Sequence, residues 1–539
     1  MGRWRRCGCF EATEWRPASS AGVLRPSLGL RHVGSVFVAG MLAVCRAESL
    51  AREDMRYVLC PRRTWPSADL GDLGTLKVYA ASVATDEGPT RDPRGRARAP
   101  LVLRAALLLD DSSSWHAKLP LLDEHHNPDD GHAADLSYRK CLGAELPRSY
   151  QVSCRVRWRQ DGGAGVMNTT ELGEGRIASF DNVEVRQQFA HCVLGGTFAK
   201  RWLRRTGPPE RFYIDIVIHA TQEDEEVYRE APAAAVLQLP LCRVQRPLLR
   251  MSFCSQPLYG LRGLQSEIPY VVEDWLSHHL ERLRVQHAEI YDVDGSFGEV
   301  VRRHWLRRAS QWHNTDSPSE NWQGTLEYHS HFPANLSEDL ASNSREHPYC
   351  AEMFAYSHCL TTHRAISRWV MLLHAPDEYL VLPAMRKPHH DDPRILEAVL
   401  KELTESMPEE EPVGMAMVEA ASFARGIPGG NAADYPRASS GHVLGSSQRR
   451  SDKWYQHSPM LDPHVCTCAG AHTCYAESLS TYRALTFGVD LSRMKIHHYV
   501  EMLERNLGRC SKQHKACSVE DDSAAWLVRR LRHHVAAGG

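Results

Sequence analysis

Residues 369–380 restrict the fold of this chain more than any other segment does. Residues 369–373 are all apolar, which predicts a strand that is buried on both faces. Asp377 and Glu378 follow after a short turn, and the chain then becomes apolar again. Strands of this kind belong to open α/β sheets, which bind ligands at the carboxyl ends of their strands. We therefore expect the two carboxylates at a ligand-binding edge, where a carboxylate can hold a divalent cation that neutralises a diphosphate.

The bulk composition limits the classes of protein to consider. The chain has 539 residues, enough for two or three domains of roughly 100–200 residues each. Hydrophobic residues make up 42% and charged residues 24%, which is a globular composition. The net charge of −2 gives no overall field that would attract nucleic acid, so we expect no nucleic-acid partner. The sequence has no phosphate-binding loop, dinucleotide fingerprint or serine-hydrolase elbow, which disfavours kinases, dinucleotide oxidoreductases and serine hydrolases.

Residues 1–74 have the pattern of a targeting and linker region. Six arginines lie within residues 1–31, and a short apolar run follows over residues 33–45. This arrangement resembles a signal peptide or a membrane anchor near the N-terminus, although the run is shorter than the ~20 residues of a full membrane span. An organelle transit peptide and a later start at Met41 or Met55 are the alternatives.

Sixteen cysteines are distributed along the chain. This number is typical of proteins from an oxidising lumen, so we expect several disulfides and a location in the secretory pathway. Asn168 and Asn335 begin tripeptides that permit N-glycosylation, which fits the same location. Residues 464–474 contain His and Cys at a density typical of zinc sites but lack two separated ligand pairs, so we expect disulfides there.

Residues 75–250 are predicted to form a β-rich domain. Four short runs alternate in part between apolar and polar residues, as half-buried strands do. These runs are residues 76–83, 101–109, 150–158 and 212–219. Polar loops rich in Gly and Pro separate them, and short strands divided by turns favour a sandwich.

Residues 252–510 change to an alternation of strands and helices. The predicted helices are residues 270–284, 297–308, 352–367 and 394–406, and the predicted strands are residues 288–292 and 369–373. This alternation predicts an α/β domain in which helices cover a parallel or mixed sheet. Residues 425–452 are rich in Gly and Ser and form either an active-site lid or a disordered insertion. Residues 511–539 are assigned to a C-terminal helix.

A second acidic turn competes with the one at Asp377. Asp292 and Asp294 follow a predicted strand and match the Asp-x-Asp pattern of a metal motif. The same residues followed by Gly295 also make an ordinary turn, because Asp and Gly suit turn geometry. From the residues alone, the ordinary turn is the favoured interpretation.

Several blocks in residues 252–505 match the motifs of one known family in order and spacing. The matching blocks are residues 270–292, residues 352–364, residues 369–380, the segment from Lys453 that contains His464 and His472, and the pair of His498 and Tyr499. Together they resemble glycosyltransferase family 92.

The resemblance implies a GT-A fold in the second domain. It also implies an inverting, metal-dependent transfer of a hexose, often galactose, from a UDP-sugar to a glycan acceptor. The implied cofactor is a divalent metal, Mn²⁺, and the implied location is the Golgi membrane or lumen. The β-rich part would then correspond to the small β domain that precedes the catalytic domain in some members.

Three positions depart from the family pattern. Arg284 stands where a glycine is usual, Glu352 where a glutamine is usual, and Ala375 replaces the first metal-binding Asp. A cation can still be held by one carboxylate together with a histidine, phosphate oxygens and waters. The chain is therefore either an enzyme with a weakened metal site or a catalytically inactive carbohydrate-binding protein on a glycosyltransferase scaffold.

The expected metal ligands are Asp377 and His472. Asp377 keeps the second acidic position of the family's metal motif, and His472 lies in a late block that contains a histidine. The ordinary explanations are a solvated turn carboxylate and one histidine among 29.

Five further residues receive roles in catalysis or nucleotide binding. An inverting transfer needs a general base to take the proton of the acceptor hydroxyl. Glu378 and Glu419 are the candidates for catalysis, although Glu378 is equally explained as a structural hydrogen-bond acceptor. Tyr291 and Asp292, at the end of an early strand, and Arg364, at a basic position of the family, are assigned to the nucleotide.

Overall fold

The computed structural model describes the parts of the chain that form the two main sheets and their helices. The described residues are 56–60, 65–85, 101–110, 150–159, 167–181, 186–194, 211–220, 233–244, 248–261, 263–264, 271–302, 325–334, 336–346, 351–386, 394–407, 413–422, 448–449, 455–470, 472–476, 485–498 and 519–520. The expected leader, nearly all of the expected lid and the expected C-terminal helix lie outside these residues. No helix within them is both long enough and apolar enough to span a lipid bilayer.

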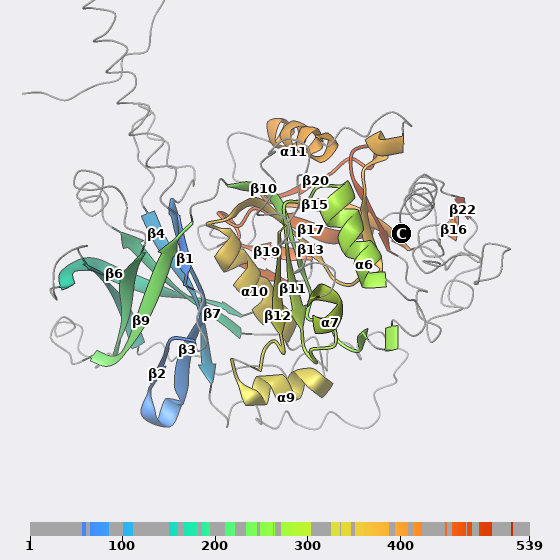
Figure 1. The fold of residues 1–539 in the computed structure, drawn as a ribbon. Coiled ribbons are helices and arrows are strands. Elements are labelled where there is room, and N and C mark those ends of the chain that lie inside the picture. Colours follow the sequence, from blue (N-terminus) through green and yellow to red (C-terminus); the bar gives the residue numbers. More distant parts are fainter. Residues whose placement is uncertain are drawn as a thin grey trace, which may run out of the picture. The chain divides into compact units, whose positions relative to one another are not determined.

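The first sheet is made of antiparallel strands. They are β1 (Tyr57–Leu59), β2 (Ser67–Asp69), β3 (Thr75–Thr85), β4 (Leu101–Asp110), β5 (Tyr150–Arg159), β6 (Met167–Asp181), β7 (Arg186–Leu194), β8 (Arg211–Ala220) and β9 (Ala233–Arg243). Their order is β1-β9-β8-β5-β6-β7-β4-β3-β2, and β1 also pairs with β3 (Figure 1). All strands except β2 therefore form a closed ring, which is a β-barrel.

Alternate residues of β4 and β8 point into the barrel. On β4 the inward set runs from Leu101 to Leu109 in steps of two, and on β8 it runs from Phe212 to Ile218. All of these side chains are at most 4% exposed. Because a strand places alternate side chains on opposite faces, closing the sheet buries the inner set without a second sheet.

The structure corrects the expected sandwich. A sandwich needs two stacked sheets, whereas these strands belong to one sheet that closes through β1. The barrel also includes β1, which precedes residue 75, as does β2, which extends the same sheet beside β3. A disulfide joins Cys60, next to β1, to Cys242 of β9. The sequence did not predict β1, because a strand of three residues is too short to show an alternation.

The second sheet is mixed, as the sequence predicted for the α/β domain. Its strands are β10 (Leu249–Ser255), β11 (His287–Asp292), β12 (Thr325–Ser330), β13 (Ser367–Leu373), β14 (Glu378–Val381), β15 (Val413–Ser422), β17 (Tyr455–Leu461), β20 (Leu485–Gly488) and β21 (Lys495–His498). The order is β12-β11-β10-β13-β17-β15-β21-β14, and β20 pairs with β15. The strands β10 to β13 are parallel to one another, while β17 is antiparallel to both of its neighbours.

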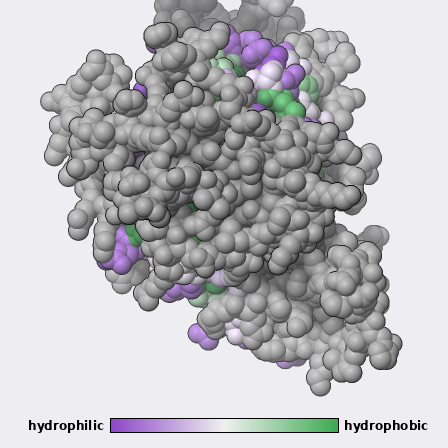
Figure 2. Space-filling view, turned by 90° about the vertical axis from the view of Figure 1, so that its right-hand side faces the viewer, coloured by the Kyte–Doolittle hydropathy of each residue, from purple (hydrophilic) through white to green (hydrophobic). Residues whose placement is uncertain are grey.

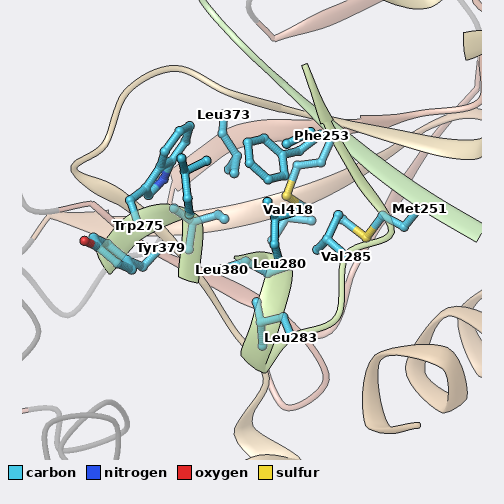
Figure 3. Packing of buried hydrophobic residues seen from close by; sticks show 14 of the residues in the cluster. Met251, Phe253, Trp275, Leu280, Leu283, Val285, Leu373, Tyr379, Leu380 and Val418 are labelled. Carbon is cyan, nitrogen blue, oxygen red and sulfur yellow. The ribbon is translucent and has the colours of Figure 1, made fainter. Parts of the chain in front are cut away.

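Helices pack against both faces of the second sheet. They are α6 (Val271–Leu276), which continues as a π-helical turn (Ser277–Arg282), α7 (Gly298–Val301), α9 (Glu338–Glu346), α10 (Glu352–His363) and α11 (Ile395–Ser406). The α6 and α11 helices share one apolar cluster with alternate residues of β10, β11 and β13. Figure 3 shows Phe253, Trp275 and Tyr379 in this cluster, where the rings of Phe253 and Trp275 meet edge to face at 5.1 Å.

The α10 helix packs between the opposite face of this sheet and the barrel. Phe354 of α10 shares an apolar cluster with Tyr79 of β3 and Phe189 of β7. The guanidinium of Arg364, just after α10, donates to the carbonyl oxygen of Val102 on β4 at 2.8 Å. The outer faces of these barrel strands are thereby buried, which explains why β4 is buried at nearly every position.

The helices expected over residues 270–284, 352–367 and 394–406 are confirmed, with ends a few residues from those predicted. The helix expected over residues 297–308 begins at Gly298 and is described only as far as residue 302. Two small sheets complete the described elements. They are β16 (Gln448–Arg449) with β22 (Val519–Glu520), and β18 (Cys468–Gly470) with β19 (Thr473–Tyr475).

Arg284 follows the π-helical turn with a φ of 58°. This left-handed conformation suits glycine, because a Cβ atom is disfavoured there. We expect Arg284→Gly to raise the free energy of unfolding by about 1 kcal/mol, because it removes this strain. Urea denaturation measures the change. The control is Glu281→Gly, at an exposed helical position, which should lower the free energy of unfolding by about 1 kcal/mol. A loss of stability in Arg284→Gly would show that the arginine side chain outweighs the strain.

The described surface has no extended apolar patch. The exposed large hydrophobic residues in the described ranges are Val193, Val236, Leu248 and Tyr259. On the face shown in Figure 2, the described residues are mainly hydrophilic, with a few hydrophobic ones between them. Scattered hydrophobic residues of this kind are normal on a protein surface and identify no docking site.

Candidate functional site

The carboxyl ends of β10, β11 and β13 lie along one edge of the second sheet. From β10 the pairing extends to β11 and β12 on one side and to β13 on the other, so the strand order reverses at β10. Open α/β sheets bind ligands in the crevice outside such a reversal. Ser255 of β10 pairs with Leu373 of β13, so the turn after β13 begins at this edge.

The turn after β13 carries the two expected carboxylates. The carboxylate of Glu378, at the start of β14, is buried and accepts the backbone N–H of His374 at 2.8 Å. Its other oxygen lies 2.8 Å from Nδ1 of the His374 ring. Asp377 precedes it, and its side chain is 23% exposed. The buried carboxylate therefore fixes the turn, while its neighbour remains accessible to a ligand.

The pairing of β14 with β21 brings a histidine to this turn. Glu378 is opposite His498 in the register, and Nε2 of His498 lies 3.4 Å from Oδ2 of Asp377. Burial alone would lower the pKa of His498, but the Asp377 carboxylate raises this pKa above its usual value. The Asp377 carboxylate therefore shifts the equilibrium of His498 toward its imidazolium form.

His374 completes the group, which we call the acid–histidine cluster: His374, Asp377, Glu378, His472 and His498. Burial alone would lower the pKa of His374, but the Glu378 carboxylate raises it to about 9. The His374 ring lies 5.2 Å from the ring of His472, in the turn between β18 and β19. Of the two expected metal ligands, Asp377 lies in the turn itself, while His472 is exposed and adjoins the cluster through the His374 ring.

The acid–histidine cluster contains carboxylate oxygen and imidazole nitrogen atoms, both of which suit first-row transition metals. Among the described residues, however, the groups whose ligand atoms already lie within 4.8 Å of one another all contain Glu289 and not these residues. The Oδ1 atom of Asp377 has no hydrogen-bond partner among the described residues, so it can accept a ligand without breaking a bond. Ala375, which replaces the family's first Asp, packs instead against the apolar cluster on the α6 side. Phosphate oxygens and water would have to supply the remaining ligands of a cation held here.

The competing acidic turn after β11 is held by its own hydrogen bonds. Asp292 accepts the backbone N–H groups of Asp294, Gly295 and Phe297 at 3.2, 2.9 and 2.8 Å. It also accepts the hydroxyl of Tyr328 at 2.6 Å. Both carboxylate oxygens are thus used to build the turn. The arrangement explains the Asp-x-Asp-Gly pattern without a metal, while contact of Asp292 with a nucleotide stays a prediction.

The other three predicted residues lie in different surroundings. Tyr291 is fully buried, and its hydroxyl donates to Glu289 at 2.7 Å. Arg364 is fully buried, and its guanidinium donates a hydrogen bond to a backbone carbonyl of the barrel. This structural role explains an arginine at the position without a nucleotide. Glu419 lies on β15, which pairs with β21 from Ala420 onward. Glu419 therefore directly precedes the segment of β15 that pairs with β21, the strand that carries His498.

Two members of the acid–histidine cluster had no assigned role in the sequence. His374 lies three residues before Asp377 and could have been found by asking what neutralises the adjacent carboxylates. His498 comes from a strand more than a hundred residues later, and only the register of β14 with β21 places it beside the turn. Its one signal was the histidine–tyrosine pair that ends the family resemblance.

His279 supports the same turn from the helix side. Its Nδ1 lies 2.8 Å from the carbonyl oxygen of Trp275, and its Nε2 lies 3.2 Å from the backbone N–H of Leu380 on β14. A neutral ring with its proton on Nδ1 satisfies both groups, whereas a second proton on Nε2 would point at an N–H. Burial lowers the pKa of His279 to about 4.

We expect acid to destabilise the fold through His279. The unfolded chain binds this proton below pH 6.5 and the folded chain only below about 4, so the free energy of unfolding falls as the pH is lowered between these values. The loss should be on the order of 3 kcal/mol. Urea denaturation across this range should give a shallower pH dependence for His279→Gln, while His331→Gln, at an exposed position, should match the wild type. Equal slopes in all three proteins would contradict the assignment.

His and Glu side chains of the second sheet and of α10 could also hold a metal ion. Glu289 on β11 is common to every such group among the described residues. The groups are Glu289 with His329 and His358, and Glu289 with His287 and the exposed Glu327; Cys254 and Cys359 also lie near Glu289 and His363, but they are joined in a disulfide. None of these residues belongs to the acid–histidine cluster.

Several cysteines are paired, as the sequence predicted. The disulfides are Cys60–Cys242, Cys154–Cys192, Cys254–Cys359 and Cys466–Cys474. The last pair confirms that residues 464–474 form a disulfide rather than a zinc site. These bonds are compatible with an oxidising secretory environment.

Comparison with known proteins adds no family to these observations. No protein-family model matches the chain, and no curated protein sequence is significantly similar to it.

Proposed function

We propose that the chain is a metal-dependent glycosyltransferase that transfers a hexose from a UDP-sugar to a glycan acceptor. Galactose is the proposed sugar, Mn²⁺ the proposed cation, inversion the proposed stereochemical course, and the Golgi the proposed location. The proposal includes a GT-A fold for the domain that begins at β10. The single observation that supports it best is the acid–histidine cluster at the carboxyl edge of the sheet.

The position of this cluster fits the chemistry of a nucleotide-sugar donor. A diphosphate leaving group develops negative charge, which a cation beside Asp377 would stabilise. His374 and His498 carry raised pKa values, so their imidazolium forms would add positive charge at the same edge. The buried Glu378 holds His374 in place, so Glu378 has a positioning role in this arrangement.

The test is the release of UDP by the purified full-length chain. A panel of UDP-sugars is supplied with a glycan acceptor mixture, with and without Mn²⁺. Release from one donor that requires the metal would support the proposal and identify the sugar. The absence of release from every donor in the folded protein would reject transferase activity on these substrates.

The second candidate is a carbohydrate-binding protein without turnover, and the observation that favours it is Ala375. With alanine at this position, only one of the family's two metal carboxylates is present, and the side chain contacts apolar neighbours. If a weakened metal site limits the enzyme, Ala375→Asp should lower the Mn²⁺ concentration required for UDP release by about tenfold. Ala375→Asn, which adds no charge, is the matched control. Glycan binding that is insensitive to metal, with no UDP release from either variant, would support the second candidate.

A further inference from the structure

On the α10 side of the second sheet a carboxylate is buried whose ion-pair partners among the described residues are all histidines. Glu289 of β11 is 0% exposed. Its Oε1 atom lies 3.5 Å from Nε2 of His329 on β12, and its Oε2 atom lies 3.9 Å from Nδ1 of His358 on α10. The three ligand atoms of these residues all lie within 4.8 Å of one another. Three separate elements thus aim one donor atom each at a common point.

These separations are too long for hydrogen bonds and suit an ion between the groups. Hydrogen bonds between N and O atoms span about 2.7–3.2 Å. Two ligands that each lie about 2.1 Å from a tetrahedral zinc ion are separated by about 3.4 Å. Oε1 of Glu289 and Nε2 of His329 are both buried, and neither has a hydrogen-bond partner among the described residues. A buried polar atom without a partner is costly, and a shared cation would satisfy both.

The groups around the carboxylate resemble the outer shell of a metal site. The hydroxyl of Tyr291 donates to Oε2 of Glu289 at 2.7 Å and lies 2.8 Å from Nδ1 of His358. Nε2 of His363 lies 3.6 Å from the same carboxylate, while its Nδ1 is held by Ser367 at 2.8 Å. Such second contacts orient the ligands of bound metals and fix their protonation.

We propose that Glu289, His329 and His358 bind a structural zinc ion. The ion ties β11 and β12 to α10 and therefore joins the sheet to the helix that also contacts the barrel. Zinc is the metal of choice because it accepts a tetrahedral set of imidazole and carboxylate ligands and has no redox chemistry. Iron sites with the same ligand types keep positions open for substrate, whereas Glu289 is fully enclosed.

The alternative is an ion pair without a metal. In that case, a protonated His329 balances the Glu289 charge, and His358 stays neutral. In this arrangement the Tyr291 hydroxyl bridges Glu289 and His358, but the 3.5 Å gap between Glu289 and His329 stays unfilled, which is why the zinc site is the better account of the geometry. The two arrangements differ in one measurable quantity, the metal content.

Metal analysis of the purified full-length chain after dialysis against metal-free buffer tests the proposal. We expect about one zinc ion per chain in the wild type, because buried structural zinc is retained. Asp377→Asn should keep this zinc, since Asp377 belongs to the acid–histidine cluster and not to this site. His329→Gln should lose it and melt at a lower temperature, while the matched control His331→Gln, at an exposed position two residues away, should keep it.

Two results would overturn the proposal. The first is a wild-type chain that contains no zinc after dialysis and gains no thermal stability when zinc is added. The second is zinc that is lost in Asp377→Asn but kept in His329→Gln, which would place it in the acid–histidine cluster. If His329→Gln does not fold, retention of zinc by Asp377→Asn separates this site from the acid–histidine cluster, and X-ray absorption at the zinc edge of the wild type must show only nitrogen and oxygen ligands. Sulfur ligands or iron in place of zinc would also contradict the assignment.

Discussion

Asp377→Asn should reduce metal-dependent UDP release by at least about 100-fold, because the cation would lose its one accessible carboxylate and with it the charge that stabilises the leaving diphosphate. The substitution keeps the size of the side chain. It also keeps an oxygen that can face His498, whose Nε2 lies 3.4 Å from the carboxylate in the wild type. The measurement is the initial rate of UDP release as a function of Mn²⁺ concentration.

Asp72→Asn is the matched control for this prediction. Asp72 is exposed in the short helical turn between β2 and β3, far along the chain from the acid–histidine cluster, so its amide variant should release UDP at the wild-type rate. Circular dichroism checks that both variants fold. Wild-type rates in Asp377→Asn at low Mn²⁺ would show that Asp377 does not hold the catalytic metal and would move the site elsewhere.

Arg364→Met should lower the free energy of unfolding by about 3 kcal/mol, since it removes charged hydrogen bonds and leaves buried carbonyl groups unsatisfied. Arg364 is 0% exposed and donates to the carbonyl oxygens of Val102 and Ala84 in the barrel at 2.8 and 3.5 Å. Methionine fills a similar volume but donates no hydrogen bond. Urea denaturation measures the loss.

Arg493→Met is the control, because Arg493 forms an ion pair with Glu402 at 2.8 Å on the surface. Removing an exposed pair of this kind should cost less than about 1 kcal/mol. A second measurement separates the two roles of Arg364. If it also contacts the nucleotide, as the family resemblance implies, the KM for the UDP-sugar should rise in Arg364→Met under conditions in which the variant is folded.

The sequence predicts the second domain better than the first. Residues 369–373 form β13, and residues 394–406 match α11, because long apolar runs and helical periodicity depend only on local sequence. The barrel was expected as a sandwich, since both folds use the same short alternating strands. Only the pairing of Tyr57 with Val83 and Arg243 decides between them, and that information is not local.

The candidate site shows the same division. Asp377 and Glu378 were found because they follow a recognisable strand. Their partners depend on which strands become neighbours, and β21 reaches the turn only through a pairing across more than a hundred residues. For Asp292, the ordinary turn explains the hydrogen bonds, as turn chemistry alone suggested. The buried position of Glu289 was not predictable, because His287, Glu289 and Tyr291 alternate with apolar residues, a pattern that predicts a solvated face rather than a buried one.

The closure of the barrel through β1 decides where a truncated chain can begin. A fragment that starts at residue 75 would lack the three residues that pair with both β3 and β9 and would also lack Cys60, the partner of Cys242. The two strands would then present unpaired edges, which favour pairing with other chains, and Cys242 would be a free thiol. Fragments for expression should therefore begin before Arg56, so that both the closing strand and its disulfide are kept.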